Sequence, residues 1–504
     1  MRFFARFIFM KSIITVSGVS FELQNGRILF ENISFSLSSK RTALVGPNGI
    51  GKTCLAKILV GDILPTKGTV RINKAATYIQ QTETAPAITV ESYLLPSYSW
   101  SVLGEKLLSG INRTTLCSNL SGGQWMRVRL AAKIENQFLI LDEPSNNLDQ
   151  EAKSILRNFL EEYKSGIFLI SHDREILELC EDVLELSNQG LAKYGGGWSS
   201  YQKEKERERS QGLNELSKAQ RERDKAKAER NIRINKQEKR NQQGRAFANK
   251  TGMSKIEIGA KKRQAQTTTG KTNVSTLEAA NAKVKKAFEI YSEIKIDPVM
   301  YIELSGVEIP SNKLIAEAIN YNIFLDRWLY QKDLNFSWKG NVRLAIKGSN
   351  GSGKTTLVKS IIGHSSNKTK GELRVGKLKT FYLDQNHSNI IEKLNIFENV
   401  RSISKMSDSE IRNSLAKLLF TGDSVFQQVE SLSGGERLRV ALACGLLAAE
   451  KPELIILDEP TNNLDLANIQ FLENLISQFK GAVIIISHDE VFLSNCGIQT
   501  ELLL

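Results

Sequence analysis

Two stretches of the sequence combine glycines, one lysine and one threonine in the spacing G-x-x-x-x-G-K-T. Each stretch follows an apolar run typical of a strand and precedes a helical pattern. Glycines at this spacing let backbone N–H groups wrap phosphate oxygens, while the lysine reaches the outer phosphates and the threonine hydroxyl ligates Mg²⁺. We therefore predict two phosphate-binding loops, called P-loops below. The predicted binding residues are Gly46, Asn48, Gly49, Gly51, Lys52 and Thr53 in the first loop, and Gly348, Asn350, Gly351, Gly353, Lys354, Thr355 and Thr356 in the second.

Two further apolar runs, FLIL and LIIL, end in an acidic pair. The pairs are Asp142 with Glu143 and Asp458 with Glu459. We predict that the two aspartates hold Mg²⁺ through water and that the two glutamates act as general bases or position the attacking water. A surface turn would also place two carboxylates side by side, but the buried-strand pattern before each pair argues against it.

Histidine and glutamine recur at matching positions. The chain has four histidines, and two of them, His172 and His488, occupy the same Ser-His-Asp motif after a strand-like run. A histidine satisfied at a strand end is the alternative to a catalytic one. Gln81 and Gln385 lie 29 and 31 residues after the P-loop lysines, and we predict that they face Mg²⁺ and the attacking water. Gln80 competes with Gln81 for the first of these positions.

The sequence LSGGQWMRVRL begins at Leu120 and LSGGERLRVAL begins at Leu432. A serine and two glycines at a helix start offer a hydroxyl and an open backbone to a phosphate. Since each half of the chain already has a P-loop, we predict a head-to-tail pair in which each Ser-Gly-Gly signature closes on the nucleotide held by the other half. The signature residues are Ser121, Gly122, Gly123, Ser433, Gly434 and Gly435.

These motifs occur in the same order twice, about 300 residues apart, which indicates duplicated domains and not a short structural repeat. Continuous apolar runs alternating with helical patterns are typical of an α/β fold with a parallel sheet. We place the two domains at residues 10–200 and 299–504. Met10 competes with Met1 as the start of translation, so the first nine residues are expected either not to belong to the protein or to form a loose tail.

The segment between the domains, residues 201–298, has a different composition. From Gln202 to Lys286 it holds 24 Lys and Arg against 10 Asp and Glu, whereas the rest of the chain holds 44 against 45. The first part is rich in helix formers, and about 40 residues of helix would reach roughly 60 Å. A capping-box sequence at Ser275 predicts a second helix. We therefore predict a basic helical hairpin that binds a polyanion; a solvated, partly disordered linker is the alternative.

Taken together, the motifs resemble the ATP-binding cassette superfamily, and two cassettes joined by a charged linker resemble its ABC-F subfamily. The resemblance implies a cytoplasmic ATPase that uses ATP and Mg²⁺ and associates with the ribosome. Its linker would reach rRNA and the P-site tRNA, and the two cassettes would pair within one chain without an obligate oligomer. Some members of that subfamily tune or rescue translation, and others confer antibiotic resistance.

The sequence departs from the family pattern at several points. About 38 residues separate Gln81 from the first signature, which leaves no room for the arm found in some members. The family's T-N-H-L-D appears as Ser-Asn-Asn-Leu-Asp and Thr-Asn-Asn-Leu-Asp. The family places an aromatic residue that stacks on adenine ahead of each P-loop. Here the aligned position in the first half is Leu23, with Phe21 nearby, and the candidates in the second half are Phe324 and Tyr321.

Two other functions compete with the ABC-F interpretation. An ATPase subunit of a membrane transporter would have little use for the basic linker, and a DNA-repair ATPase usually carries much longer coiled coils or a zinc module. The five cysteines are scattered without metal-ligand spacing, which favours reduced thiols. No apolar run approaches the roughly 20 residues of a membrane span, and we expect no signal peptide.

Overall fold

The computed structural model describes residues 12–95, 101–133, 137–146, 148–250, 281–282, 284–286, 300, 302, 308–364 and 367–504. It divides into two compact units, Met1–Tyr201 with Val299–Leu504 and Gln202–Pro298. The expectations about Met10, the hairpin tip and the helix at Ser275 fall outside the described residues.

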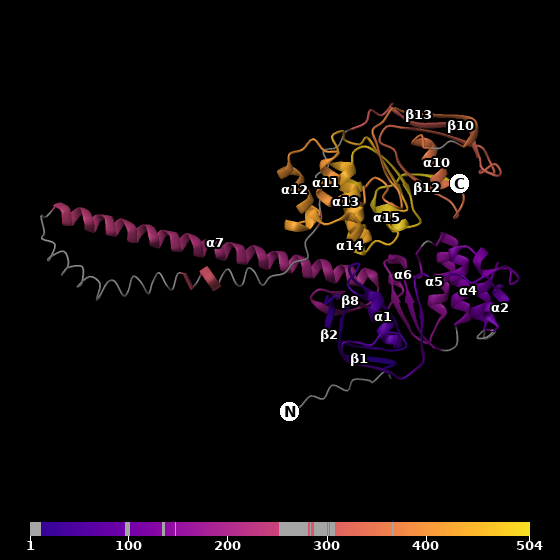
Figure 1. Ribbon diagram of the computed structural model, residues 1–504, viewed down its shortest axis with the longest axis horizontal. Helices are drawn as coiled ribbons and strands as arrows, with labels where there is room; N and C mark the ends of the chain where they lie inside the picture. Colours follow the sequence, from indigo (N-terminus) through magenta and orange to yellow (C-terminus); the bar gives the residue numbers. More distant parts are fainter. Residues whose placement is uncertain are drawn as a thin grey trace. The chain divides into compact units, whose positions relative to one another are not determined.

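The first cassette is built on a sheet with strand order β5-β6-β7-β3-β8-β9, in which β5 to β8 are parallel neighbours and β9 is antiparallel. Figure 1 draws this cassette in indigo to purple and labels β8 and helices α1, α4 and α5. A separate antiparallel sheet has the order β2-β1-β4. The strands are β1 (Ile14–Glu22), β2 (Ile28–Leu37), β3 (Arg41–Val45), β4 (Lys67–Ile72), β5 (Ala76–Ile79), β6 (Phe138–Asp142), β7 (Ile167–Ile170), β8 (Asp182–Ser187) and β9 (Gly190–Gly195). The helices are α1 (Lys52–Val60), α2 (Val90–Leu94), α3 (Val102–Leu108), α4 (Gly122–Ala132), α5 (Gln150–Glu162) and α6 (Arg174–Glu178).

The second cassette repeats this plan with sheets of order β14-β15-β16-β12-β17 and β11-β10-β13. Its strands are β10 (Leu314–Phe324), β11 (Leu334–Lys339), β12 (Arg343–Lys347), β13 (Lys368–Val375), β14 (Thr380–Leu383), β15 (Leu454–Asp458), β16 (Ala482–Ile486) and β17 (Thr500–Leu503). Its helices are α10 (Lys354–Ile361), α11 (Ile396–Arg401), α12 (Asp408–Lys417), α13 (Gly434–Leu446), α14 (Leu466–Gln478) and α15 (Glu490–Asn495).

The central strands are buried along their whole length, as their continuous apolar sequences require. Every residue of β6, β15 and β16 is buried. A strand covered on both faces cannot alternate polar and apolar residues, so its sequence is apolar throughout. The polar groups are therefore placed where the parallel strands end, at one edge of each sheet.

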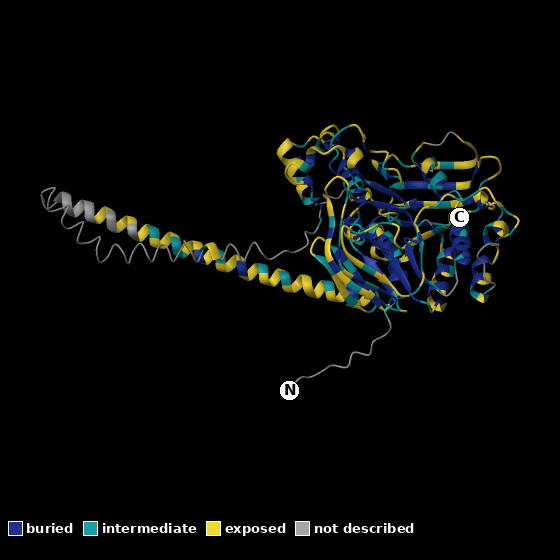
Figure 2. Ribbon diagram, turned by 60° about the horizontal axis from the view of Figure 1, so that its bottom comes forward, coloured by how far each residue is buried: buried dark blue, intermediate teal, exposed yellow. Residues whose placement is uncertain are grey.

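Helix α7 (Trp198–Lys250) begins in the first unit and continues through the second as one helix of 53 residues. The sequence predicted about 40 residues of helix here. Figure 2 shows that it is exposed along most of its length. A narrow stripe is less exposed and contains Ala219 and Ala226, which are buried. Leu213 and Ile232, two of its few apolar residues, are about half exposed and lie off this stripe.

The predicted fold class is confirmed: the fold is α/β, with two cassettes and an intervening helix. The return arm of the predicted hairpin falls largely outside the described residues. Within the part of the chain that is described, no helix combines the length and the apolar character that crossing a membrane requires.

Candidate nucleotide sites

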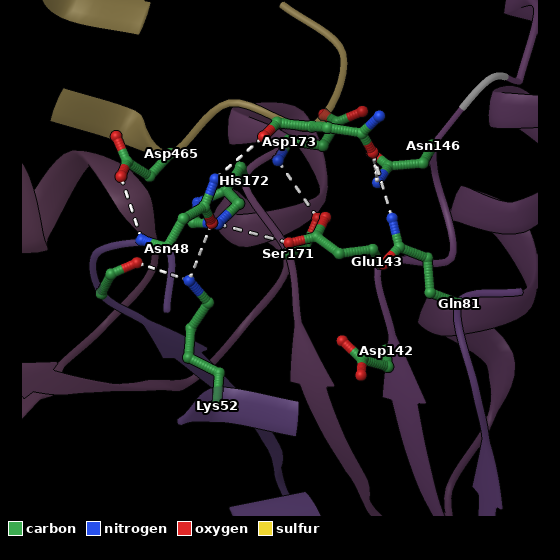
Figure 3. Close-up of polar contacts among 12 residues, drawn as sticks. Asn48, Lys52, Gln81, Asp142, Glu143, Asn146, Ser171, His172, Asp173 and Asp465 are labelled. Carbon is green, nitrogen blue, oxygen red and sulfur yellow. Dashed lines mark hydrogen bonds and ion pairs between the residues drawn. The ribbon is translucent and has the colours of Figure 1, made fainter. Parts of the chain in front are cut away.

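Strand order explains why motifs far apart in the sequence meet. In the first cassette the neighbouring strands β5, β6, β7 and β3 lead into Gln81, Asp142, His172 and the P-loop, in that order across the sheet (Figure 3). In the second cassette β14, β15, β16 and β12 present Gln385, Asp458, His488 and the P-loop in the same order. Each fold therefore collects one complete set of the predicted residues at one sheet edge.

Each P-loop turns tightly before its helix. Gly51 and Gly353 have φ values of 106° and 96°, a region that disfavours residues with a Cβ. Lys52 Nζ donates to the carbonyl oxygens of Gly46 at 2.6 Å and Pro47 at 3.1 Å. Lys354 Nζ makes the same contacts to the corresponding carbonyls, at 2.7 and 3.1 Å. Both ammonium groups thus lie over the loop in which phosphates are expected.

The threonine that follows each P-loop lysine is hydrogen-bonded to the aspartate at the end of the acidic strand. Thr53 Oγ1 donates to Asp142 Oδ2 at 2.8 Å, and Thr355 Oγ1 donates to Asp458 Oδ2 at 2.8 Å. Burial raises the pKa of both aspartates, and the threonine hydrogen bonds oppose that rise. Thr and Asp oxygens side by side at the mouth of a P-loop form a donor set suited to Mg²⁺.

Two tyrosines that sequence reasoning missed complete this cluster. Tyr78 donates its hydroxyl proton to Asp142 Oδ2 at 2.9 Å, and Tyr382 donates to Asp458 Oδ2 at 3.1 Å. The signal was present as the repeated spacing Tyr-x-x-Gln, which pairs Tyr78 with Gln81 and Tyr382 with Gln385. The same spacing places Gln81, and not Gln80, at the position equivalent to Gln385.

Each glutamate of the acidic pairs lies beside a histidine. His172 Nε2 is 3.4 Å from Glu143 Oε1, and His488 Nε2 is 3.5 Å from Glu459 Oε1. Burial raises the pKa of Glu143 to about 8 and that of Glu459 to about 7. Burial also lowers the pKa of His172, and lowers that of His488 to about 4. Neutral imidazoles beside carboxyl groups that titrate near neutral pH suit proton transfer at that pH.

The same glutamates sit in an unusual backbone conformation. Glu143 and Glu459 have φ values of 47° and 48°, the left-handed region that residues with a Cβ rarely adopt. Their N–H groups donate to the last residue of the neighbouring strand, at 2.8 Å to Ile170 O and 2.9 Å to Ile486 O. The same strained turn therefore recurs in both cassettes. The charge of Lys52 or Lys354 opposes the rise in the pKa of the glutamate in the same cassette, so each carboxyl group lies near its P-loop lysine.

Each signature serine caps the helix that follows it. Ser121 Oγ accepts from Gln124 N at 3.2 Å and Ser433 Oγ accepts from Glu436 N at 3.4 Å, each within a capping box. A Cβ on the second glycine would meet its own cassette: at Gly123 it would lie 3.0 Å from Ala152 Cβ, and at Gly435 it would collide with Asn468 Nδ2. At the first glycines, Gly122 and Gly434, the space is open or nearly so. Packing inside the cassette therefore requires glycine at the second position, whereas nothing inside the cassette requires it at the first.

The first P-loop contacts the Asn-Asn-Leu-Asp turn of the second cassette. Asn48 N donates to Asp465 Oδ2 at 3.0 Å, and Asn48 Nδ2 donates to Asn463 O at 2.9 Å (Figure 3). Asn463 Oδ1 also accepts from Gln81 Nε2 at 3.1 Å and from Asn146 Nδ2 at 3.3 Å. The turn of one cassette thus reaches the P-loop of the other, which is the polarity that head-to-tail pairing requires.

A cavity of about 260 Å³ lies between the cassettes and is lined by polar residues of both. Lys153 Nζ pairs with Asp173 Oδ2 at 2.9 Å on one side of it. The other lining residues include His172, Glu459, His488 and Asp489. The two predicted catalytic histidines therefore border one shared space.

The residues present fit ATP and Mg²⁺. Asp458 Oδ1 is buried and has no hydrogen-bond partner among the described residues, so this oxygen is available to a metal-bound water. Of the candidate adenine-stacking residues in the second cassette, Tyr321 is buried in the core, whereas Phe324 is exposed beside Trp328 with ring centroids 5.4 Å apart. In the first cassette Phe21 packs against Phe30.

Comparison with known proteins agrees with this geometry. The family model described as "ABC transporter" matches residues 30–146 and 331–462. The ATP-binding protein Uup of Buchnera aphidicola subsp. Acyrthosiphon pisum (strain APS) is 28% identical, covering 96% of this chain and 79% of its own length. The ribosome protection protein VmlR of Bacillus subtilis (strain 168) is 28% identical, covering 98% of this chain and 89% of its own length. The chain belongs to the ABC-F subfamily of ATP-binding cassette proteins.

Solved structures agree on the fold of this ABC-F protein. A structure titled "RNase-L Inhibitor" superposes with a TM-score of 0.58 at 18% identity, covering 95% of this chain and 86% of its own. The archaeal ribosome recycling factor aABCE1, solved in complex with the ribosomal stalk protein aP1, superposes with a TM-score of 0.57 at 18% identity over the same shares of the two chains. At this identity the likeness establishes a tandem-cassette fold. Membership makes both cassettes ABC ATPase domains, a class that binds ATP, generally with Mg²⁺.

Proposed function

We propose that this chain hydrolyses ATP between its cassettes and uses the resulting opening and closing to act on the ribosome through its linker. The proposal assigns residues 10–200 and 299–504 to the cassettes and residues 201–298 to a linker that contacts rRNA and the P-site tRNA. The observation that carries it is helix α7, a continuous basic helix of 53 residues inserted between two near-neutral cassettes.

The residues of each site have different roles in this proposal. Lys52 and Lys354 hold the outer phosphates, and the paired Thr and Asp oxygens hold the metal. Bound Mg²⁺ would neutralise phosphate charge as the terminal phosphate leaves. Glu143 and Glu459 take the proton of the attacking water, with His172 and His488 beside them and Gln81 and Gln385 orienting that water. These catalytic and metal-binding roles rest on the contacts described above and on the family.

The signatures complete the sites from the opposite cassette. In this proposal Ser433 and Gly434 close on the nucleotide at Lys52, and Ser121 and Gly122 close on the nucleotide at Lys354. The contacts of Asn48 with Asn463 and Asp465 support this polarity. Closure with ATP and release after hydrolysis would then change the angle between the cassettes and so move whatever is attached to both.

The linker offers the charge that a polyanion requires. Between Gln202 and Lys286 the linker holds 24 basic against 10 acidic residues, whereas the rest of the chain holds 44 against 45. Attraction to rRNA or tRNA therefore acts on the linker and much less on the cassettes. VmlR is named a ribosome protection protein, which makes protection of a translating ribosome the first form of action to test.

The test neutralises basic residues of α7 and compares them with a matched set on the cassettes. The first variant changes Arg209, Lys218, Arg221 and Lys227 to Gln; the control changes Lys67, Arg71, Lys339 and Lys368 to Gln, all eight residues being exposed. We expect the first variant to lose about tenfold or more in ribosome affinity, with a shallower dependence on salt, and the control to lose little. Equal losses in both variants, or none in the first, would contradict a linker-based contact.

A further inference from the structure

A buried ion pair joins the two cassettes beside the nucleotide sites. Arg174 follows the Ser-His-Asp motif of the first cassette and donates to Glu473 of α14 through Nη1 at 2.6 Å and Nη2 at 3.2 Å. The two side chains are only 5% and 9% exposed. A bidentate pair this far from water is sensitive to the sign of each charge, because an unmatched charge there cannot be solvated.

The repeat shows which residues occupy the same two positions in the opposite copies. The residue after Ser-His-Asp is Arg174 in the first cassette and Glu490 in the second. Eight residues after the last aspartate of the Asn-Asn-Leu-Asp turn, the second cassette has Glu473 and the first has Arg157. Both charges are therefore reversed between the copies, although the motifs that define the positions are shared.

This reversal has a consequence for every other pairing through the same surfaces. If two first cassettes met, Arg157 would take the place of Glu473 and face Arg174. If two second cassettes met, Glu490 would take the place of Arg174 and face Glu473. Either arrangement buries two like charges where the observed one buries an opposite pair, and so it is strongly disfavoured.

The observed partners are also held in place from outside the pair. The guanidinium of Arg174 lies over the ring of Trp198, the first residue of α7, at 5.7 Å from the centroid. Glu473 Oε1 also accepts from Asn495 Nδ2 at 3.0 Å. These contacts limit the freedom of either side chain to turn away from a wrong partner.

The reciprocal residues do not share this burial. The side chains of Arg157 and Glu490 are 50% and 45% exposed. Arg157 Nε lies 3.4 Å from Glu161 Oε1, and Glu490 accepts from Lys347 at 2.8 Å. Solvent screens these exposed charges, so the buried pair carries most of any selectivity.

We propose that Arg174 and Glu473 determine which cassettes pair. They stabilise pairing of a first cassette with a second cassette and destabilise pairing of two copies of the same cassette. The proposal concerns an interaction surface whose partner is the opposite cassette of this chain. It stands whether or not the linker binds a ribosome, because it predicts assembly and not action on translation.

Charge reversals in the full chain distinguish the stability of cassette pairing from the choice of partner cassette. R174E should weaken pairing within the chain and allow first cassettes of two chains to meet, since the introduced carboxylate would face Arg157. E473R should likewise allow second cassettes to meet through Glu490. The double variant R174E/E473R should recover pairing within the chain and still permit both like-cassette contacts.

The measurement is cross-linking mass spectrometry on a mixture of isotopically light and heavy chains, which distinguishes links within a chain from links between chains. Light scattering on the same samples reports mass. We expect like-cassette links between chains to rise about tenfold or more in the double variant over wild type, while links within the chain return to the wild-type level. The control pair, R71E and E31R, applies the same charge changes at exposed residues of β4 and β2 and should match wild type.

Two results would overturn the proposal. The double variant could recover pairing within the chain and show no like-cassette links, which would make the ion pair a stabilising contact without selectivity. Alternatively, the single reversals could pair as wild type does. If a single reversal fails to fold, R174Q and E473Q provide the same comparison: each removes one repulsion, so each should raise like-cassette links above wild type, and a wild-type level would overturn the proposal.

Discussion

The two cassettes repeat the same side-chain contacts at their candidate nucleotide sites, whereas helix α7 presents charged side chains to solvent. Thr53, Asp142 and Tyr78 form one hydrogen-bonded cluster in the first cassette, and the equivalent residues form another in the second with distances that agree within 0.2 Å. Helix α7 is not duplicated in this way, and most of its described residues are exposed to solvent (Figure 2). A single substitution should therefore disable a cassette, while the linker should respond in proportion to the charge removed.

The largest effect should come from the two glutamates. In E143Q/E459Q the proposed bases are removed but the P-loops and the proposed metal ligands remain, so we expect turnover to fall by about 10²-fold or more while ATP stays bound. Steady-state phosphate release and retention of labelled ATP measure the two quantities. Turnover near the wild-type rate would show that neither glutamate acts on the water.

Replacing the predicted tip of the linker tests whether the linker acts on translation independently of ATP turnover. Replacing residues 245–272 with a short Gly-Ser turn removes the predicted tip, including Arg245, Lys250, Lys255, Lys261, Lys262 and Arg263. We expect ATP turnover without ribosomes to be unchanged, because the cassettes build their sites without the tip. Any effect on in vitro translation should be lost. A tip-replaced protein that still acts fully on translation would move the function into the cassettes.

The buried glutamate predicts how stability depends on pH. Burial gives Glu143 a pKa of about 8 in the folded chain, above its ordinary value of 4.5. Between these two pH values the folded state therefore holds a proton that the unfolded state has lost. Stability from this group is present below pH 4.5 and is lost as the pH rises to about 8. E143Q removes the ionisable group, so its advantage over wild type should grow with pH, to the order of a few kcal/mol.

Thermal unfolding without nucleotide at about pH 5.5 and about pH 9 measures this difference. Glu151→Gln, at an exposed residue of α5, is the matched control and should not reproduce the trend. An E143Q protein whose advantage is the same at both pH values would mean that Glu143 is ionised at little cost in the folded chain.

The smallest effect should come from the tyrosines. Y78F/Y382F removes one hydrogen bond from each aspartate proposed to bind the metal, about 1 kcal/mol at each site. We expect the Mg²⁺ concentration for half-maximal turnover to rise about fivefold with little change in maximal rate. Y163F removes a hydroxyl bonded to Gln137 O outside the sites and serves as control. If Y78F/Y382F and Y163F show the same Mg²⁺ dependence, the hydroxyl groups of Tyr78 and Tyr382 do not contribute to metal binding.

How much the sequence predicts differs between the same two regions. The P-loops, acidic pairs and Ser-His-Asp motifs were predictable because each is a short local pattern and parallel strands bring their ends to one edge. The hydrogen bond of Tyr78 was not predicted, because its acceptor, Asp142, comes within reach only when β5 pairs with β6. Arg174 and Glu473 escaped for a similar reason: their contact joins separate cassettes, and no local motif encodes it.

Gly435 shows a second limit. The sequence predicts that its missing side chain makes room for a nucleotide, and this stays a prediction. The structure adds a packing reason that the sequence did not reveal, because Asn468 of the same cassette lies where a Cβ would be. In the linker, composition predicted a helix. Composition alone did not reveal which apolar residues would be exposed. Leu213 and Ile232 are exposed, whereas Leu216 and Ile234 lie with the buried Ala219 and Ala226 on the less exposed stripe.

One measurement tests the central claim, that ATP held by the cassettes controls a linker-based contact with the ribosome. E143Q/E459Q is sedimented with ribosomes in the presence of ATP or ADP, at low and high salt, alongside the same protein with the α7 substitutions R209Q, K218Q, R221Q and K227Q. The account predicts co-sedimentation with ATP, much less with ADP, a steep loss with salt, and weaker binding when α7 is neutralised. Binding that is indifferent to the nucleotide and to the charge of α7, or no binding at all, would contradict it.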